Sequence, residues 1–189
     1  TSNLTADFFG NLYKTDKKKF FSYYKVYISQ ISYLLNEIGV NINTVPVLDV
    51  RRLKSNNIIG DRSYSTLPKN VSKIGDFCIE EFKKKQIGTV MKHVPGHGLA
   101  KVDSHKLTPV VKKKIKYLSK NDFMPFKNKK IFFAMTAHVI YKKIDPINTA
   151  THSSKIIKLI RKKIGFKNII ISDDISMKGL KYSIKQNLN

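Results

Sequence analysis

Short apolar runs alternate along this chain with segments of helical periodicity, and this alternation limits the folds that the chain can adopt. The apolar runs, which we interpret as strands, cover residues 42–48, 87–91, 131–135 and 169–171. Apolar side chains recur every three or four positions in the segments 20–38, 71–82 and 156–164. Strands that alternate with helices predict an α/β fold with a parallel sheet and helices outside it.

Local signals set the expected ends of the helices. Gly39 and Gly165 are each placed to end a helix as the residue after its last turn, and Ser153 or Ser154 can cap the start of the last helix. Residues 110–126 are expected to be helical in part, with Pro125 limiting that helix. The polar stretch 51–65 is long enough to be a functional loop.

Each predicted strand is followed at its carboxyl end by a polar side chain. These residues are Asp49, His93, His138 and Asp173. Such regularity favours a (β/α)8 TIM-type barrel, with a doubly wound open sheet as the alternative, because four units alone do not distinguish the two folds. A barrel needs eight strands and typically about 250 residues. We therefore expect residues 1–189 to form one partial barrel domain with about four strand–helix units.

The formal net charge of +23 raises the alternative of a basic nucleic-acid-binding domain. The excess comes from lysines in every segment, beside many Ile and Asn residues, which is the composition that an AT-rich genome encodes. Specific phosphate and base contacts favour arginine, and a reading face would concentrate the charge. We therefore expect no specific nucleic-acid partner.

The single cysteine, Cys78, excludes an internal disulfide and fits a reducing compartment. Its place on an apolar helix face predicts a buried side chain. The apolar runs fall short of the roughly 20 residues that a membrane span needs. From these features we expect a cytoplasmic protein without a membrane span.

The stretch 92–98, Lys-His-Val-Pro-Gly-His-Gly, carries the densest group of titratable residues with the nearby Asp103-Ser104-His105. Pro95 and Gly96 exclude a helix, so we expect a loop at a strand end. Residues 92–98 and 103–105 together contain four side chains of metal-ligand type: His93, His97, Asp103 and His105. A zinc site of the His-x-x-x-His kind would need a helix, so we expect no metal and no cofactor.

These segments together resemble the bacterial β-N-acetylhexosaminidases of glycoside hydrolase family 3. The resemblance rests on residues 92–98 with 103–105, and on 45–50, 137–141 and 171–177 in the same order. Arg62-Ser63-Tyr64 fits a further family position. The resemblance implies strands four to seven of the family's barrel.

The family's catalytic residues carry over to matching positions here. The resemblance implies that Asp173 is the nucleophile of a retaining mechanism and that Asp174 is a neighbour of structural importance. It implies that His105 is the general acid and base and that Asp103 holds its imidazole. Without the resemblance, the sequence would favour a helix cap for Asp173 and Asp174. It would likewise favour a surface turn for Asp103-Ser104-His105.

The resemblance also implies a substrate. Arg62, Lys92 and His93 match positions that bind the sugar, and His138 matches a position near the site. The expected partner is a saccharide with a terminal β-linked N-acetylglucosamine, and the expected role is peptidoglycan recycling. A β-glucosidase is less favoured, because those family members lack the Asp-Ser-His segment. Phosphorolysis in place of hydrolysis stays an alternative.

One family segment, Asp-Gln-Glu-Gly-Gly-Arg, has no counterpart in these 189 residues. In the family its Asp and Arg hold the sugar. A truncated, non-catalytic barrel fragment is therefore a further alternative, and the sequence does not predict an oligomeric state.

Overall fold

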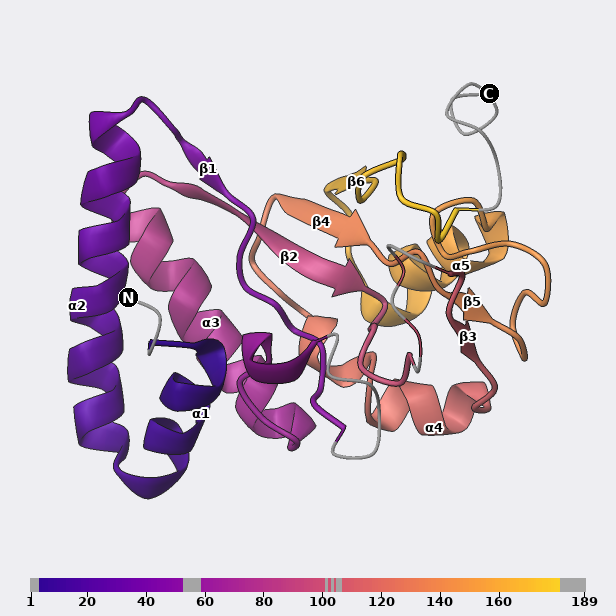
Figure 1. The fold of residues 1–189 in the computed structure, drawn as a ribbon, viewed down its shortest axis with the longest axis horizontal. Coiled ribbons are helices and arrows are strands. Elements are labelled where there is room, and N and C mark those ends of the chain that lie inside the picture. The colour runs from indigo at the N-terminus through magenta and orange to yellow at the C-terminus, as the bar shows by residue number, and fades with distance from the viewer. Residues whose placement is uncertain (1–3, 53–58, 101, 103, 105–106, 181–189) are drawn as a thin grey trace.

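The computed structural model describes residues 4–52, 59–100, 102, 104 and 107–180. Its central sheet contains four parallel strands in the order β1-β2-β4-β6 (Figure 1). Their bounds are Ile42–Asn43 for β1, Gly88–Val94 for β2, Phe133–Thr136 for β4 and Ile169–Ile171 for β6. The α/β class and the parallel sheet are thus confirmed, and the strands lie side by side in the order in which they occur along the chain.

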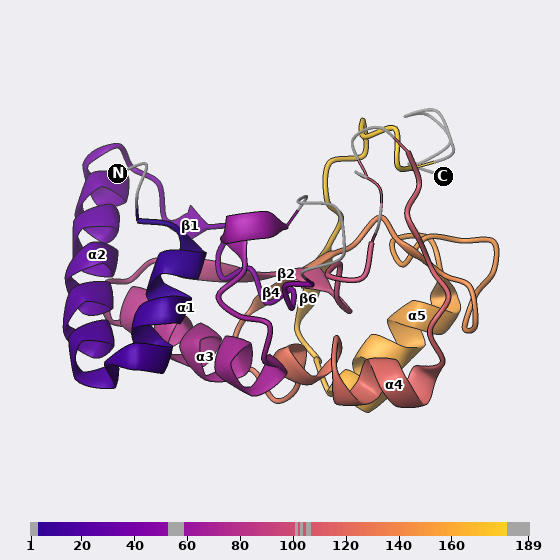
Figure 2. The ribbon, with the colours of Figure 1, turned by 60° about the horizontal axis from the view of Figure 1, so that its bottom comes forward.

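Helices lie on one face of this sheet, and the two N-terminal helices pack against each other and against the first helix of that layer. The helices are α1 (Ala6–Thr15), α2 (Lys17–Glu37), α3 (Pro68–Lys84), α4 (Ile115–Lys120) and α5 (Ser154–Leu159), which a π-helical turn, Ile160–Ile164, continues. Figure 2 shows α3, α4 and α5 together on one side of the strands. A doubly wound sheet reverses its strand order and carries helices on both faces, whereas a barrel carries them on the outside alone. The arrangement is therefore a segment of a (β/α)8 barrel.

The N-terminal region holds a helix that the periodicity did not predict. Thr5 caps α1 by accepting a hydrogen bond from the Phe8 amide at 3.1 Å. Phe9 of α1 then packs against Tyr24 of α2, with ring centroids 4.4 Å apart. The helix is only ten residues long, so tertiary packing of its aromatic residues stabilises it more than its intrinsic helix propensity does.

Residues 110–126 are helical in part, as expected, and they also contain a strand that the sequence did not predict. Val110–Val111 form β3, which pairs in parallel with β5 (Ile140–Tyr141) in a separate small sheet. The helix α4 is confined to six residues, and a 3-10 turn, Met124–Phe126, contains Pro125. The sequence did not reveal this strand because Ile140, the partner of Val110, is remote in the sequence.

The first two strands differ from their predicted bounds. The regular strand β1 covers only Ile42–Asn43, and the segment after it, where Pro46 cannot donate an amide hydrogen bond, still bonds to β2 through the carbonyls of Val45 and Pro46 and the Leu48 amide. The strand β2 runs on to Val94. Lys92 and His93 therefore belong to the end of a strand, and not to the loop in which the sequence placed them.

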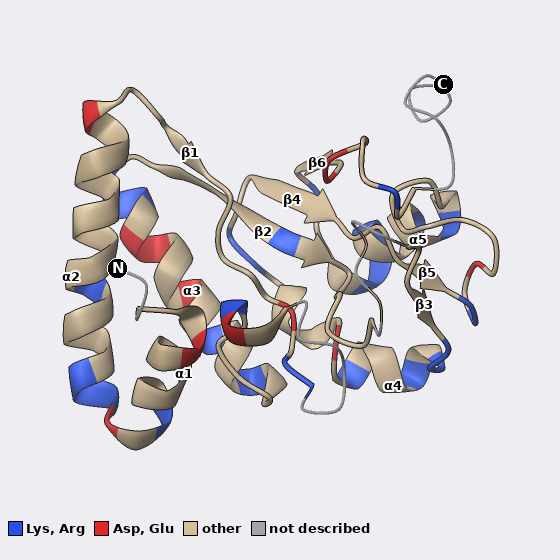
Figure 3. Cartoon of the chain, in the orientation of Figure 1, with Lys and Arg blue, Asp and Glu red and all other residues tan. Residues whose placement is uncertain are grey.

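The burial of the cysteine and the distribution of charge match the expectations from the sequence. Cys78 is fully buried on α3, as expected. Figure 3 shows lysine and arginine on α2, α3, α4 and α5 as well as on loops, so the charge is not gathered on one element. Among the described residues, no helix combines the length and the apolar character that crossing a membrane requires.

Candidate active site

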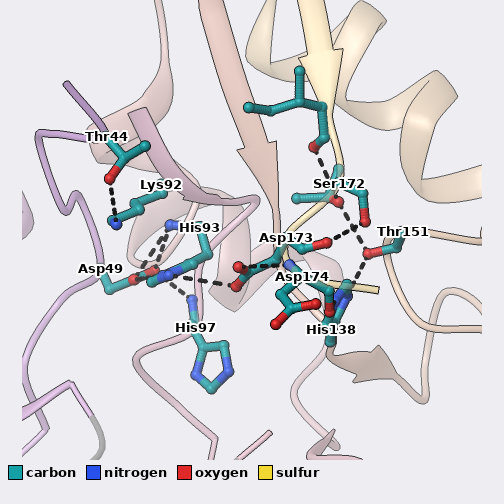
Figure 4. Close-up of polar contacts among 12 residues, drawn as sticks. Thr44, Asp49, Lys92, His93, His97, His138, Thr151, Ser172, Asp173 and Asp174 are labelled. Atoms are coloured by element: carbon teal, nitrogen blue, oxygen red, sulfur yellow. Dashed lines mark hydrogen bonds and ion pairs between the residues drawn. The ribbon is translucent and has the colours of Figure 1, made fainter. Parts of the chain in front are cut away.

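The polar residues that follow the four strands meet at one edge of the sheet, as predicted. Asp49 contacts His93, His93 lies beside Asp173, and His138 contacts Asp174 (Figure 4). The carboxyl ends of parallel strands point the same way, so residues that are distant in the chain converge there. This edge is where barrel enzymes place their catalytic groups.

A bulge in β2 shapes the centre of the site. The pairing of β2 with β4 shifts between Lys92 and Val94, so that His93 is the extra residue. Successive residues of a regular strand point to opposite faces, and a bulge re-aims a side chain. Lys92 and His93 can therefore both turn toward the same edge of the sheet.

The carboxylate of Asp49 organises the loop that follows this bulge. Its Oδ2 lies 2.6 Å from Nδ1 of His93, and its Oδ1 accepts a hydrogen bond from the His97 amide at 2.6 Å. The His93 amide donates to the same carboxylate at 3.3–3.4 Å. Burial alone would raise the pKa of Asp49, but the charge and hydrogen bond of His93 and the contacts with His97 outweigh it and lower the pKa.

An ionised Asp49 fixes the orientation of the His93 imidazole. Because a carboxylate can only accept, Nδ1 of His93 carries the proton that points to Asp49. The other ring nitrogen, Nε2, then lies 3.8 Å from Oδ2 of Asp173. That separation exceeds hydrogen-bond length. The ring of His93 thus lies between the buried Asp49 carboxylate, to which it is hydrogen-bonded, and Asp173, the candidate nucleophile.

The structure separates the roles of Asp173 and Asp174. Oδ1 of Asp174 accepts hydrogen bonds from the amide and hydroxyl of Ser176, at 2.8 and 2.7 Å, which is an Asx-type turn. The carboxylate of Asp173 is partly buried and points toward His93 (Figure 4). Residues 172–180 form turns and bends without a helix. Asp173 and Asp174 therefore do not cap a helix in this segment.

His138 ties the end of β4 to the Asp173–Asp174 turn. Its Nε2 lies 3.0 Å from the carbonyl oxygen of Asp174, so Nε2 carries a proton and donates. The hydroxyl of Thr151, 2.7 Å from Nδ1, donates to the other nitrogen. Burial lowers the pKa of His138, which favours this neutral form. His138 thereby positions the main chain beside Asp173, a role that the sequence did not reveal.

Lys92 lies near the carboxylates of Asp173 and Asp49, and Arg62 lies near Lys92. The ammonium of Lys92 donates to Thr44 Oγ1 at 3.2 Å. The pKa of Lys92 is lowered, mainly by partial burial and to a smaller extent by the positive charge of Arg62. The negative charges of Asp173 and Asp49 act in the opposite direction and raise it. Arg62 is exposed, in the 3-10 turn Gly60–Arg62. Lys92 therefore lies within electrostatic range of Arg62, Asp173 and Asp49.

His97 braces the loop through its backbone. Burial lowers the pKa of its imidazole to about 4, so the ring is neutral near pH 7. Its Nδ1 is buried without a hydrogen-bond partner within the described part of the chain. The described residues also contain no group of three side chains that could hold a metal ion.

Asp103 and His105 lie outside the described residues, so the structure does not place the predicted acid and its partner. Ser104, between them, is described and buried. A Cβ added to Gly179 would lie 2.4 Å from the Ser104 carbonyl oxygen, so the two backbones are in close contact. The backbone at Ser104 therefore lies against the segment that follows Asp173.

Replacing Gly98 with Ala is expected to destabilise the protein by about 1–3 kcal/mol, because overpacking against backbone cannot be relieved by a rotamer change. A Cβ on Gly98 would lie 2.0 Å from the carbonyl oxygen of Val50, next to Asp49. Gly88→Ala is the control, since its nearest neighbour is a flexible Ile42 side-chain atom at 3.3 Å. Urea unfolding of both variants measures the effect, and equal stability would show that the 92–98 loop does not pack as described.

Comparisons with known proteins show which family the chain is similar to. The model of the glycosyl hydrolase family 3 N-terminal domain matches residues 15–189. A β-hexosaminidase from Idiomarina loihiensis is 34% identical over 144 residues, which is 75% of this chain and 43% of that protein. The chain thus spans less than half the length of this relative.

Solved structures show the same relationship. A family 3 β-N-acetylglucosaminidase from Paenibacillus superposes with a TM-score of 0.76 at 30% identity, over 80% of this chain and 30% of that one. NagZ from Neisseria gonorrhoeae, in complex with N-trifluoroacetyl-D-glucosamine, superposes with a TM-score of 0.86 at 26% identity, over 97% of this chain and 54% of that one. The sequence match and the fold agree, and this chain belongs to glycosyl hydrolase family 3.

Proposed function

We propose that the complete protein containing this chain is a retaining β-N-acetylhexosaminidase that releases terminal β-linked N-acetylglucosamine. The observation that carries the proposal is the position of Asp173. Its carboxylate lies at the carboxyl end of β6, partly buried, beside the fixed ring of His93. The names of the relatives and the N-acetylglucosamine analogue bound to NagZ support the choice of sugar.

In the proposed first step, a carboxylate oxygen of Asp173 attacks the anomeric carbon of the sugar. The bond between that carbon and the glycosidic oxygen breaks, and the leaving oxygen takes a proton from a general acid. In the second step, water attacks the same carbon and releases Asp173. Two inversions give overall retention of configuration. The oriented ring of His93 and the turn held by His138 would keep Asp173 at the correct place for the attack.

We assign the general acid to His105, with Asp103 fixing its tautomer. A histidine can donate a proton near neutral pH and then accept one from water in the second step. The described backbone at Ser104, in contact with Gly179, supports a position of this segment near the residues that follow β6. Both side chains can point the same way from an extended segment, because they are two residues apart.

We assign sugar binding to Lys92, His93 and Arg62. The ammonium and guanidinium groups donate hydrogen bonds to hydroxyl oxygens, and Nε2 of His93 faces the space beside Asp173. We further propose that the protein acts in the cytoplasm, in the recycling of peptidoglycan fragments. The family membership and the N-acetylglucosamine analogue in NagZ support this role.

The test is the hydrolysis of an aryl β-N-acetylglucosaminide by the complete protein, followed by proton NMR. The β-anomer of N-acetylglucosamine should be formed first and should then mutarotate. First formation of the α-anomer would contradict retention, and first formation of a sugar 1-phosphate in phosphate buffer would show phosphorolysis. The matched aryl β-glucoside is the control, and its preferential hydrolysis would favour a β-glucosidase.

A further inference from the structure

We propose that Asp49 is a positioning residue of this site: its buried carboxylate holds His93 with Nδ1 protonated, so that Nε2 faces the substrate beside Asp173. The proposal rests on the proposed function and adds a group to it. Asp49 is not a sugar-binding candidate, because its side chain is fully buried.

Among the described residues, the donors to the Asp49 carboxylate come from one segment, which begins at the β2 bulge. The ring and amide of His93 and the amide of His97 converge on its two oxygens. An ionised carboxylate accepts several such bonds, and its lowered pKa keeps it ionised near neutral pH. A single side chain from the segment after β1 therefore sets both the path of the loop and the rotation of the ring.

The orientation of the ring matters because the two nitrogens of an imidazole are chemically different. With Nδ1–H directed at Asp49, Nε2 is the ring nitrogen left to contact a sugar hydroxyl, as an acceptor where it carries no proton and as a donor where it carries one. The gap of 3.8 Å between Nε2 and Asp173 Oδ2 is too long for a direct hydrogen bond. A pyranose hydroxyl placed beside both atoms can contact the two groups at once. Asp49 thus acts on the substrate through His93.

The substitution that tests this is Asp49→Asn in the complete protein. An amide has the same shape but one acceptor oxygen, and its NH2 group cannot accept from the donors of His93 and His97. The ring of His93 is expected to lose its fixed Nδ1–H form. By analogy with carboxylates behind metal-bound histidines, kcat/KM should fall about 10- to 100-fold, mainly through KM.

Two readouts separate positioning from a general loss of structure. Nitrogen NMR of the His93 ring should show a protonated Nδ1 in the wild type and its loss in Asp49→Asn. The same Asp49 substitution in a His93→Ala background should change kcat/KM much less than in the wild-type background, because the ring is absent and only the contacts with the backbone amides at positions 93 and 97 remain. Asp145→Asn is the matched control, since Asp145 is also buried and accepts from Ser153 Oγ at 2.7 Å and two backbone amides. That variant should leave the His93 signals unchanged.

Several outcomes would overturn the inference. The first is a wild-type His93 ring that carries its proton on Nε2 alone. The second is a set of His93 ring NMR signals that Asp49→Asn does not change. The third is a fall in kcat/KM from Asp49→Asn that is as large in the His93→Ala background as in the wild type. The NMR readout of the wild type needs no turnover and no variant, so it decides the inference even if Asp49→Asn does not fold. A protein without hydrolase activity but with the expected ring signals would refute the proposed function and leave the positioning intact.

Discussion

Replacing Asp173 with Asn in the complete protein is expected to lower kcat by about 10⁴-fold or more, as the removal of a nucleophile does in other covalent mechanisms. An amide cannot form the glycosyl ester that the first step requires. The fold should survive, because the Asp173 side chain is partly exposed. Its carboxylate accepts a main-chain hydrogen bond from the adjacent Asp174 amide, at 2.9 Å, which an Asn oxygen can also accept. Steady-state kinetics and a thermal unfolding curve together measure both properties.

Asp174→Asn is the matched control for this prediction. Its carboxylate shapes the turn through Ser176 and does not point at His93. We expect a loss of less than tenfold, since an Asn side chain also forms Asx turns. A larger loss for Asp174→Asn than for Asp173→Asn would mean that the nucleophile is the second aspartate of the pair.

Replacing His105 with Ala is expected to slow substrates with poor leaving groups by about 10²–10⁴-fold, the usual contribution of general acid catalysis. Substrates with activated aryl leaving groups should be slowed much less in the glycosylation step, because their oxygen departs without a proton. The comparison of kcat/KM for a nitrophenyl glycoside and for an alkyl or disaccharide substrate measures this difference.

Asp103→Ala should show a weaker form of the same pattern, because the imidazole of His105 stays present but loses its partner. Equal losses of kcat/KM for good and poor leaving groups would contradict the assignment of the acid. They would make His105 a binding or structural residue.

The sequence predicted the parts of this protein that depend on local pattern. The strand–helix alternation predicted the parallel sheet, and the polar residues after each strand predicted that Asp49, His93, His138 and Asp173 would share one edge. These predictions succeed because the direction of parallel strands fixes where their carboxyl ends lie. The left-handed Gly165, with φ of 84°, likewise ends its helix as expected.

The sequence did not predict features that depend on contacts between distant residues. The role of Asp49 needs a partner 44 positions away, and the parallel pair of Val110 with Ile140 has no local pattern of its own. The bulge at His93 likewise arises from pairing with β4. A polar residue at a strand end signalled Asp49 as a candidate, but its partner and its function required the three-dimensional arrangement.

The most direct test of the central claim is covalent trapping. A fluorinated N-acetylglucosaminyl substrate slows the breakdown of a glycosyl–enzyme ester, and peptide mass spectrometry then locates the label on the complete protein. The mechanism proposed here predicts a sugar adduct on Asp173. An adduct on Asp174 or on any other residue would contradict it, as would the absence of an adduct from a preparation that hydrolyses the unfluorinated substrate with retention.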